Sequence, residues 1–253
     1  MSNREKIFAL RSFLKDTMRK EFDFSTTDQS RGLPPPPIQK PYGKGAILIT
    51  LPDPHRSTTL GFMSVREAIS RRRSRREYSS EPLLLDELSF LLWATQGVRE
   101  IKRGQVYRTV PSAGNRHALE TYIASTNVYG LKKGVYRYLP LDHKLVMEFE
   151  EERIGEKLAR AMLGQRYPMN AAATFIWATV PQRMEWRYGE VSHKVIALDA
   201  GHVCQNLYLA CESLGLGTVA VAAYDQEAMD ELLRLDGMEE FVIYLAPVGR
   251  VHP

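Results

Sequence analysis

The chain has 253 residues, of which 44% are apolar and 25% are charged, as in an ordinary globular protein. Its formal charge of +4 fits attraction to phosphate groups but is far below that of a protein that coats nucleic acid. No stretch approaches the roughly 18 consecutive apolar residues of a membrane span, and the N-terminus has no secretory leader pattern. We therefore expect a cytoplasmic protein with neither a nucleic-acid nor a membrane partner.

The N-terminal part of the chain differs in pattern from the rest. Residues 4–22 place apolar side chains at nearly helical spacing, and residues 25–54 form a long proline-rich connection with one short strand at 47–51. We predict a helical arm and proline-rich linker over residues 1–60, followed by one domain over residues 61–253. In a dimer the arm would pack across the partner; the alternative is a helix lying on its own subunit.

The remaining chain mixes helical and strand periodicity. After a first helix capped by Ser64, the predicted helices span residues 85–96, 153–163, 198–214 and 226–235. The predicted strands span residues 121–125, 134–138, 173–180, 218–223 and 241–248. Because the order lacks regular βαβ alternation, the predicted fold class is α+β.

Five arginines surround Ser74 in the run Arg71–Arg76, at the end of the helix that Ser64 caps. Burying such a run without anions would be costly, and guanidinium groups match the geometry of phosphate oxygens. The serine hydroxyl favours a discrete phosphate site. A solvated helix end and a nucleic-acid patch are the alternatives.

Two further segments carry candidate chemistry. Residues 108–116 form a turn-rich loop whose backbone N–H groups, with Gly114 permitting close approach, would suit a planar polar ring. The helix at 198–214 ends at Gly215 and Gly217 and is also a plausible core helix. Its two cysteines are predicted to be reduced packing residues, and the sequence offers no metal-binding motif or dinucleotide fingerprint.

The order of these segments is more specific than each one alone. The run RRSRREY at 72–78, the segment from RTVPSAG to ETY at 108–122, the segment from LDAGH to LGLGT at 198–218 and APVGR at 246–250 resemble the nitroreductase-like superfamily. Within it, the chain resembles the SagB-type dehydrogenase branch. The resemblance implies an α+β fold with a central, mostly antiparallel sheet flanked by helices. It also implies an intertwined homodimer with FMN at the interface, bound by the domain at 61–253.

The resemblance assigns three groups of residues to FMN. The phosphate and ribityl chain would be held by Arg72, Arg73, Ser74, Arg76 and Arg250. The loop that the other subunit lays on the flavin would be Pro111, Ser112, Ala113, Gly114 and Asn115. The strand end at the isoalloxazine edge would be Ala220, Val221, Ala222 and Ala223.

The chain departs from the branch in two places. SagB-type oxidases of azoline rings are associated with a Lys-Tyr pair upstream of the 198–214 helix, where this chain has Ser192 and His193, followed by Lys194. This departure argues against the azoline-oxidase role. After PSAG the chain has polar residues through Arg116 and His117, a basic site mouth that favours an acidic substrate or the phosphate groups of NAD(P)H.

We expect an FMN-dependent oxidoreductase that passes hydride through flavin N5 between NAD(P)H and a small organic acceptor. The alternatives are a SagB-type FMN dehydrogenase that oxidises a peptide-derived azoline ring, and a non-enzymatic flavin-binding protein. The candidate proton donors are Tyr122, Tyr188, His193 and Tyr224.

Overall fold

The computed structural model describes residues 2–56 and 60–252. In this part of the chain seven strands form one sheet in the order β1-β6-β5-β4-β7-β9-β8, and each neighbouring pair is antiparallel. The strands are β1 (Leu48–Thr50), β4 (Leu119–Ser125), β5 (Gly134–Leu139), β6 (Lys144–Glu150), β7 (Ala173–Thr179), β8 (Leu216–Thr218) and β9 (Phe241–Arg250). The predicted α+β class and antiparallel sheet are confirmed.

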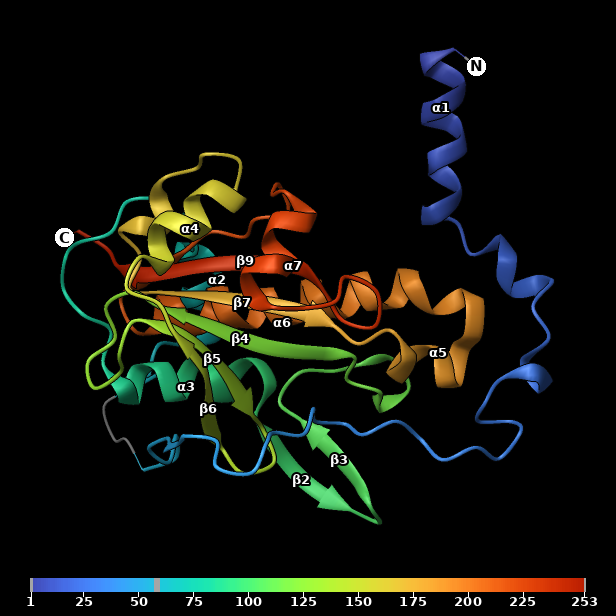
Figure 1. Ribbon diagram of the computed structural model, residues 1–253, viewed down its shortest axis with the longest axis horizontal. Coiled ribbons are helices and arrows are strands. Elements are labelled where there is room, and N and C mark those ends of the chain that lie inside the picture. The colour runs from blue at the N-terminus through green and yellow to red at the C-terminus, as the bar shows by residue number, and fades with distance from the viewer. Residues whose placement is uncertain (1, 57–59, 253) are drawn as a thin grey trace.

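Helices cover both faces of the sheet (Figure 1). The principal helices are α2 (Val65–Arg71), α3 (Leu85–Gln96), α4 (Ile154–Ala161), α5 (Gln182–Tyr188), α6 (His193–Ser213) and α7 (Gln226–Leu233). One apolar core joins the sheet to α3 and α6, and a second joins it to α4 and α7. Along β4, Ile123 faces the first core whereas Tyr122 and Ala124 face the second, because successive strand residues point to opposite faces.

The long helix α6 positions the site. The predicted helix at 198–214 is present, but it begins earlier, at His193. Its first two residues, His193 and Lys194, are polar, and of the next three only Ile196 is buried, so the apolar period was too weak to reveal this first turn. Its buried face includes Cys204 and Cys211, which are free, as predicted. Within the described residues no helix is both long enough and apolar enough to cross a bilayer.

The predicted N-terminal helix over 4–22 is wrong beyond its first turns. Helix α1 spans Asn3–Leu10 and gives way to short 3₁₀ turns. None of the side chains of α1 is buried, so its apolar spacing has no face of its own subunit to pack against. Figure 1 shows α1 standing clear of the body of the protein.

The proline-rich segment, in contrast, lies on the body. The guanidinium of Arg108 donates to the carbonyl of Ile38 at 2.8 Å, and Arg137 donates to the carbonyls of Lys40 and Pro41 at 2.8 and 3.0 Å. Strand β1 then pairs with β6, close to the predicted strand at 47–51. The division of the chain at residue 60 stays a prediction.

Other differences concern elements with weak sequence signals. The hairpin of β2 (Val98–Lys102) and β3 (Gln105–Arg108) was not predicted, because its side chains are mostly exposed and alternate poorly. Helix α5 and strand β6 were missed as well. The predicted strand at 218–223 is only partly correct: β8 ends at Thr218, Val221 keeps a single antiparallel bridge to Leu245 of β9, and Ala222 and Ala223 are exposed where the chain leaves the sheet towards α7.

Candidate functional site

The arginine run lies against the edge of the sheet. Helix α2 begins at Ser64, whose Oγ accepts from the Glu67 amide at 3.2 Å, and it ends just before Arg72. The chain then extends along β8, where Ser74 forms a bridge to Thr218 and the Arg75 amide donates to the Thr218 carbonyl at 2.9 Å. A Cβ at Gly217 would lie 2.7 Å from the Arg75 Cβ, so glycine permits this approach.

A single tyrosine of α6 joins the arginine run to the strand end at 220–223. The hydroxyl of Tyr208 lies 2.9 Å from Ser74 Oγ and accepts from the Ala220 amide at 2.8 Å. The Tyr208 ring also lies beneath the Arg72 guanidinium, at 5.1 Å from its carbon. The structure thus brings together two of the three predicted groups of flavin-binding residues.

The arginines of this edge differ in their partners. Within the described residues Arg72, Arg73 and Arg76 form no ion pair, whereas Arg71 pairs with Glu67. These three arginines lie within two residues of Ser74 in the chain, and guanidinium groups together with a serine hydroxyl are a donor set that suits a phosphate group.

The predicted late phosphate ligand, Arg250, is already engaged. Its Nη2 donates to both carboxylate oxygens of Glu87 at 2.8 and 2.9 Å, and its Nε lies 3.2 Å from Glu81. Binding phosphate would require Arg250 to share or leave these carboxylates. Its role toward the cofactor stays a prediction.

The predicted flavin loop is a closed, internally bonded turn, with Ala113–Asn115 as a 3₁₀ turn. The Ala113 amide donates to Asp199 of α6 at 3.2 Å, and the His117 amide donates to Ser112 Oγ at 2.8 Å. The amides of Asn115 and Arg116 also donate within the loop. Four amides of the segment 113–117 therefore already have acceptors, three within the loop and one on Asp199, and the role of the loop toward a flavin ring stays a prediction.

Burial shapes the ionisation of the groups around this loop. Burial raises the pKa of the Asp199 carboxyl above its ordinary value. Burial and the nearby Arg108, Arg116 and Arg183 lower the pKa of His117 to about 3, so its imidazole is neutral at pH 7. The surroundings of the loop are therefore rich in positive charge.

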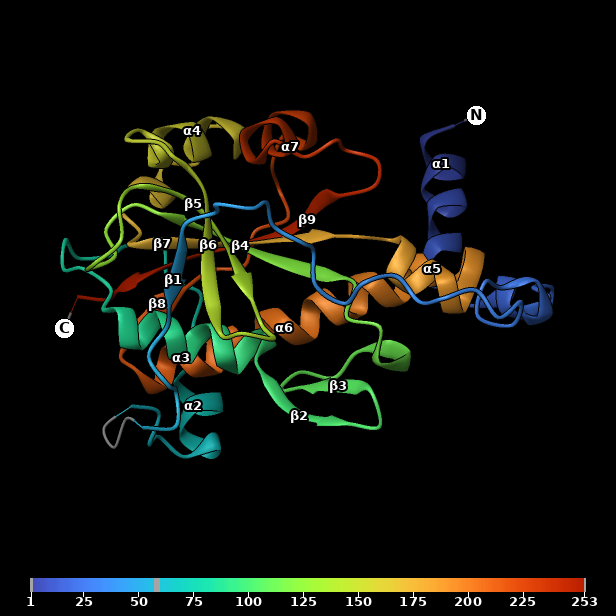
Figure 2. The same cartoon turned by 60° about the horizontal axis from the view of Figure 1, so that its bottom comes forward.

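One chain does not bring the loop and the arginine run together. Asp199, which holds the loop, and Tyr208, which holds the arginine run, are nine residues apart on α6. At 100° and 1.5 Å per residue, they lie on opposite sides of the helix and roughly 13 Å apart along it. Figure 2 shows α2 and the end of β3, which leads into the loop, at well-separated places around α6.

The four predicted proton donors are scattered. Tyr122 is buried and donates to Glu240 at 2.7 Å, and Tyr224 donates to the Val242 carbonyl at 3.0 Å; both belong to the core of α4 and α7. His193 is exposed beside Glu185. Tyr188 alone of the four contacts the loop, since a Cβ at Gly114 would lie 2.6 Å from its hydroxyl. A shared catalytic role for all four has no geometric support, and each role stays a prediction.

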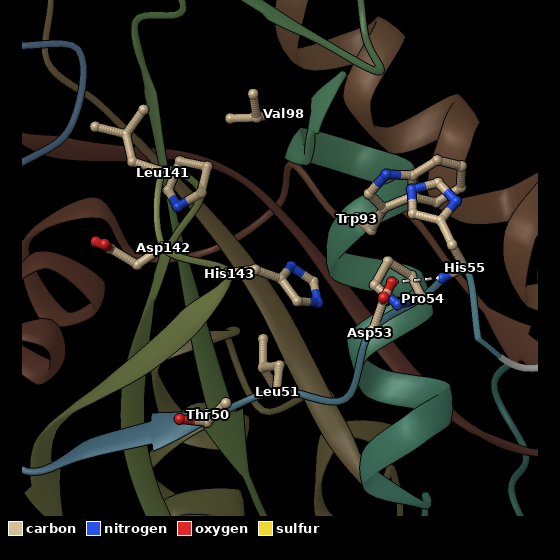
Figure 3. A pocket seen from close by; sticks show the side chains of 11 residues that line it. Thr50, Leu51, Asp53, Pro54, His55, Trp93, Val98, Leu141, Asp142 and His143 are labelled. Carbon is tan, nitrogen blue, oxygen red and sulfur yellow. Dashed lines mark hydrogen bonds between the residues drawn. The ribbon is translucent and has the colours of Figure 1, made fainter. Parts of the chain in front are cut away.

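Two cavities flank α3. An apolar groove of about 410 Å³ between α2, α3 and α6 is lined by residues that include Val65, Phe90 and Leu209. The second, of about 360 Å³, lies between the segment 50–55 and the β5–β6 turn, where His143 points inward and His55 stacks edge-on against Trp93 (Figure 3). None of the predicted flavin-binding residues lines either cavity.

Sequence reasoning missed three residues of this site. Tyr208 is the only tyrosine within the segment 198–218, and this could have singled it out. Asp199 begins the same segment, but its partner Ala113 is 86 residues away. The contact of Arg187 with Gly114 has no signal in the sequence, because only the tertiary fold places α5 against the loop.

An antiparallel α+β body of this topology, with an arginine run at one sheet edge, is what the comparisons with known proteins can identify. Residues 69–250 match the Nitroreductase family model, and the chain belongs to this family. It is 40% identical over 188 residues to a protein of Methanocaldococcus jannaschii provisionally named a nitroreductase, covering 74% of this chain and 91% of that one. These findings confirm the predicted superfamily and make the protein a nitroreductase-family oxidoreductase.

Two further comparisons extend this picture. The trifolitoxin-processing protein TfxB of Rhizobium leguminosarum bv. trifolii is 28% identical over 146 residues, 54% of this chain but only 39% of TfxB, and agrees with the resemblance to the SagB-type branch. A solved structure from Ralstonia eutropha, also provisionally a nitroreductase, superposes with a TM-score of 0.67 at 28% identity. It covers 87% of this chain and all of that one.

Proposed function

We propose that the protein is an FMN-dependent oxidoreductase that works as a homodimer and moves hydride between NAD(P)H and a small organic acceptor. The observation that carries this proposal is the set of contacts of Tyr208, which join Arg72 and Ser74 of the arginine run to the strand end at Ala220. A phosphate group binds to cationic side chains, and a flavin ring binds against a complementary protein surface. The contacts of Tyr208 place candidates for both next to one another.

The residues at this edge of the sheet match the chemical groups of FMN one by one. Arg72, Arg73 and Arg76 would hold the phosphate, with Ser74 donating to a phosphate or ribityl oxygen. The segment Ala220–Ala223 would meet the isoalloxazine edge. When bound, FMN supplies the hydride acceptance and donation that the family's redox chemistry needs.

The position of the loop supports the proposed homodimer. Because Asp199 and Tyr208 lie on opposite sides of α6, the loop at 111–115 and the arginine run of one chain face different directions. We call the proposed phosphate-binding residues Arg72, Arg73, Ser74 and Arg76 the clamp. The loop of a second copy would lie against the clamp of the first and exclude water from it. Val65 of α2 is exposed and lines the apolar groove, and Ile69 of the same helix is exposed as well; both would supply apolar surface for this contact.

The cofactor is tested by the visible absorption spectrum of the purified protein, before and after adding FMN and desalting. We expect a retained flavin band that is lost in the double variant Arg72→Ala/Arg76→Ala. Anaerobic addition of NADH and NADPH should then bleach the band. A protein that retains no flavin even with excess FMN would contradict the proposal, whereas retention without bleaching by any donor would favour a flavin-binding protein that is not an enzyme.

The second candidate function is the oxidation of an azoline ring in a modified peptide, in the manner of SagB-type dehydrogenases. The match to a toxin-processing protein favours it. The positions of the Lys-Tyr pair argue against it, because they hold Ser192, which is buried, and His193, which is exposed and lies 3.0 Å from Glu185. Incubation with an azoline-containing peptide, followed by mass spectrometry for a loss of two hydrogens, distinguishes the two functions.

A further inference from the structure

Two arginines beside the loop at 111–115 have no part in the proposed clamp. The side chain of Arg187, on α5, lies directly on the loop, since a Cβ at Gly114 would come within 2.5 Å of its Cδ and 2.6 Å of its Nε. Arg116 follows the loop, and its guanidinium carbon lies 4.8 Å from the ring centroid of Trp186, the residue before Arg187. Loop and helix thus hold both guanidinium groups at one edge of the loop.

Neither of these two side chains has an anionic partner within the described part of the chain. The carboxylates around the loop are already engaged. They are Glu120 with Arg183, Glu185 with His193, and Asp199 with the Ala113 amide. Arg116 Nε is buried without a hydrogen-bond partner, while Arg187 has one hydrogen bond of 3.2 Å to the neutral Gln29 side chain.

The arrangement is electrostatically costly as it stands. Burial and the positive charge of Arg187 lower the pKa of Arg116, which means that the two cations repel each other. An anion with two or three oxygens would offset this repulsion and satisfy the fork of each guanidinium. The backbone amides of Ala113 and of residues 115–117 already donate to Asp199 or to other atoms of the loop. The guanidinium N–H groups are therefore the strong donors at this edge.

We propose that Arg116 and Arg187 form an anion subsite that holds a carboxylate or phosphate of the molecule exchanging hydride with the flavin. The proposal rests on the proposed function, in which the loop of one subunit lies on the flavin of the other. In either case the subsite binds an anionic oxygen group of the reacting molecule. Its source is either a carboxylate of the acceptor or the ribose 2′-phosphate that distinguishes NADPH from NADH.

The test uses flavin-loaded protein and ligands that differ by one charge. Binding and KM are measured for 4-nitrobenzoate against neutral 4-nitrobenzamide, and for NADPH against NADH, in the wild type, Arg116→Gln and Arg187→Gln. Calorimetry supplies the binding data independently of turnover. The matched control is Arg160→Gln, an exposed arginine of α4 on the other face of the sheet with the same loss of charge.

A carboxylate subsite predicts that each variant weakens 4-nitrobenzoate about tenfold or more, with a much smaller effect on the amide and none in the control. A 2′-phosphate subsite predicts the same loss for NADPH but not for NADH. Equal changes for charged and neutral ligands, or no change in any of the four, would overturn the proposal.

Two controls separate this proposal from others. Flavin retention, measured from the visible band, must be the same in wild type and variants; if the wild type itself retains no flavin, the proposed function fails and not the subsite alone. Size-exclusion chromatography with light scattering reports the oligomeric state. A variant that becomes monomeric would show that the arginines pair with the partner subunit, and this outcome also overturns the proposal.

Discussion

At the residue scale, Tyr208 does the most to assemble the site. Its hydroxyl is the acceptor for the Ala220 amide and the partner of Ser74, two residues that come from different parts of the chain. Its ring supports Arg72 through a cation–π contact. A side chain of this kind fixes the relative position of clamp and strand end without touching the reacting atoms.

Replacing Tyr208 by phenylalanine keeps the ring and removes the hydroxyl. We expect Tyr208→Phe to lower the free energy of unfolding by about 1–2 kcal/mol, since the Ala220 amide loses its acceptor. FMN affinity should fall about tenfold as Ser74 and Ala220 move. Denaturant titration and flavin fluorescence measure the two effects. Tyr129→Phe, at an exposed position, is the control; equal flavin affinity in both variants would argue against the positioning role.

His117 makes stability depend on pH. Its folded-state pKa of about 3 lies below its ordinary 6.5, so the unfolded chain binds a proton that the folded chain does not as pH falls below 6.5. As the pH falls from 6.5 to 5.0, we expect the free energy of unfolding to decrease by about 2 kcal/mol because of His117, at about 1.4 kcal/mol per pH unit. The stability it supports is present above pH 6.5 and is lost towards pH 3.

Urea denaturation at pH 7.5 and 5.0 measures this dependence. The variant His117→Gln should lose most of the pH-dependent part, while His55→Gln, at an exposed histidine, should keep it. An unchanged slope in His117→Gln would mean that other groups cause the dependence.

At the element scale, the close approach of the arginine run to β8 depends on Gly217. A Cβ there would lie 2.5 Å from a Val251 methyl and 2.7 Å from Arg75 Cβ, and one of these segments must move. We expect Gly217→Ala to displace the arginine run, with a loss of about 1–3 kcal/mol in stability. FMN binding should weaken at the same time.

Thermal unfolding and flavin titration of Gly217→Ala are compared with Gly43→Ala, where a Cβ meets no atom within 4 Å. Gly43→Ala should leave both measurements close to the wild type. Tight flavin binding in Gly217→Ala would show that the approach of the run to β8 is not needed for the clamp.

At the scale of the whole molecule, the exposed apolar surface supports the proposed homodimer. Ile69 of α2 is 58% exposed, and Val65 of the same helix is 69% exposed and lines the apolar groove between α2, α3 and α6. The apolar side chains of the N-terminal arm, among them Leu10 and Leu14, are exposed as well. This surface agrees with the proposed homodimer and with an arm that packs on the partner.

The variant Ile69→Glu places a charge in this surface. We expect it to shift the protein from dimer to monomer and to lose its flavin, because burying an unpaired carboxylate in an apolar interface is costly. Light scattering and the visible spectrum measure both effects. The control is Met238→Glu, at a 79% exposed position near α7, which should remain dimeric and retain its flavin. A dimeric, flavin-loaded Ile69→Glu would place the interface elsewhere.

The sequence by itself determined those parts of the protein whose interactions are local. Helix α3 is bounded by its Glu87 cap and Gly97, the apolar period of α6 marks its buried face, and the arginine run follows its capped helix within a few residues. These signals depend on neighbours three or four positions away, so they can be found in the chain itself.

Only the tertiary structure decided how these segments meet. Ser74 contacts Tyr208, which is 134 residues away, and Gly114 lies beneath Arg187 because α5 packs on the loop. The proline-rich segment is held at Ile38 and Lys40 by buried arginines far along the chain. The tertiary structure also set the loop and the clamp on opposite sides of α6, which points to a site built from two subunits. Such contacts depend on the path of the whole chain, and no local pattern encodes them.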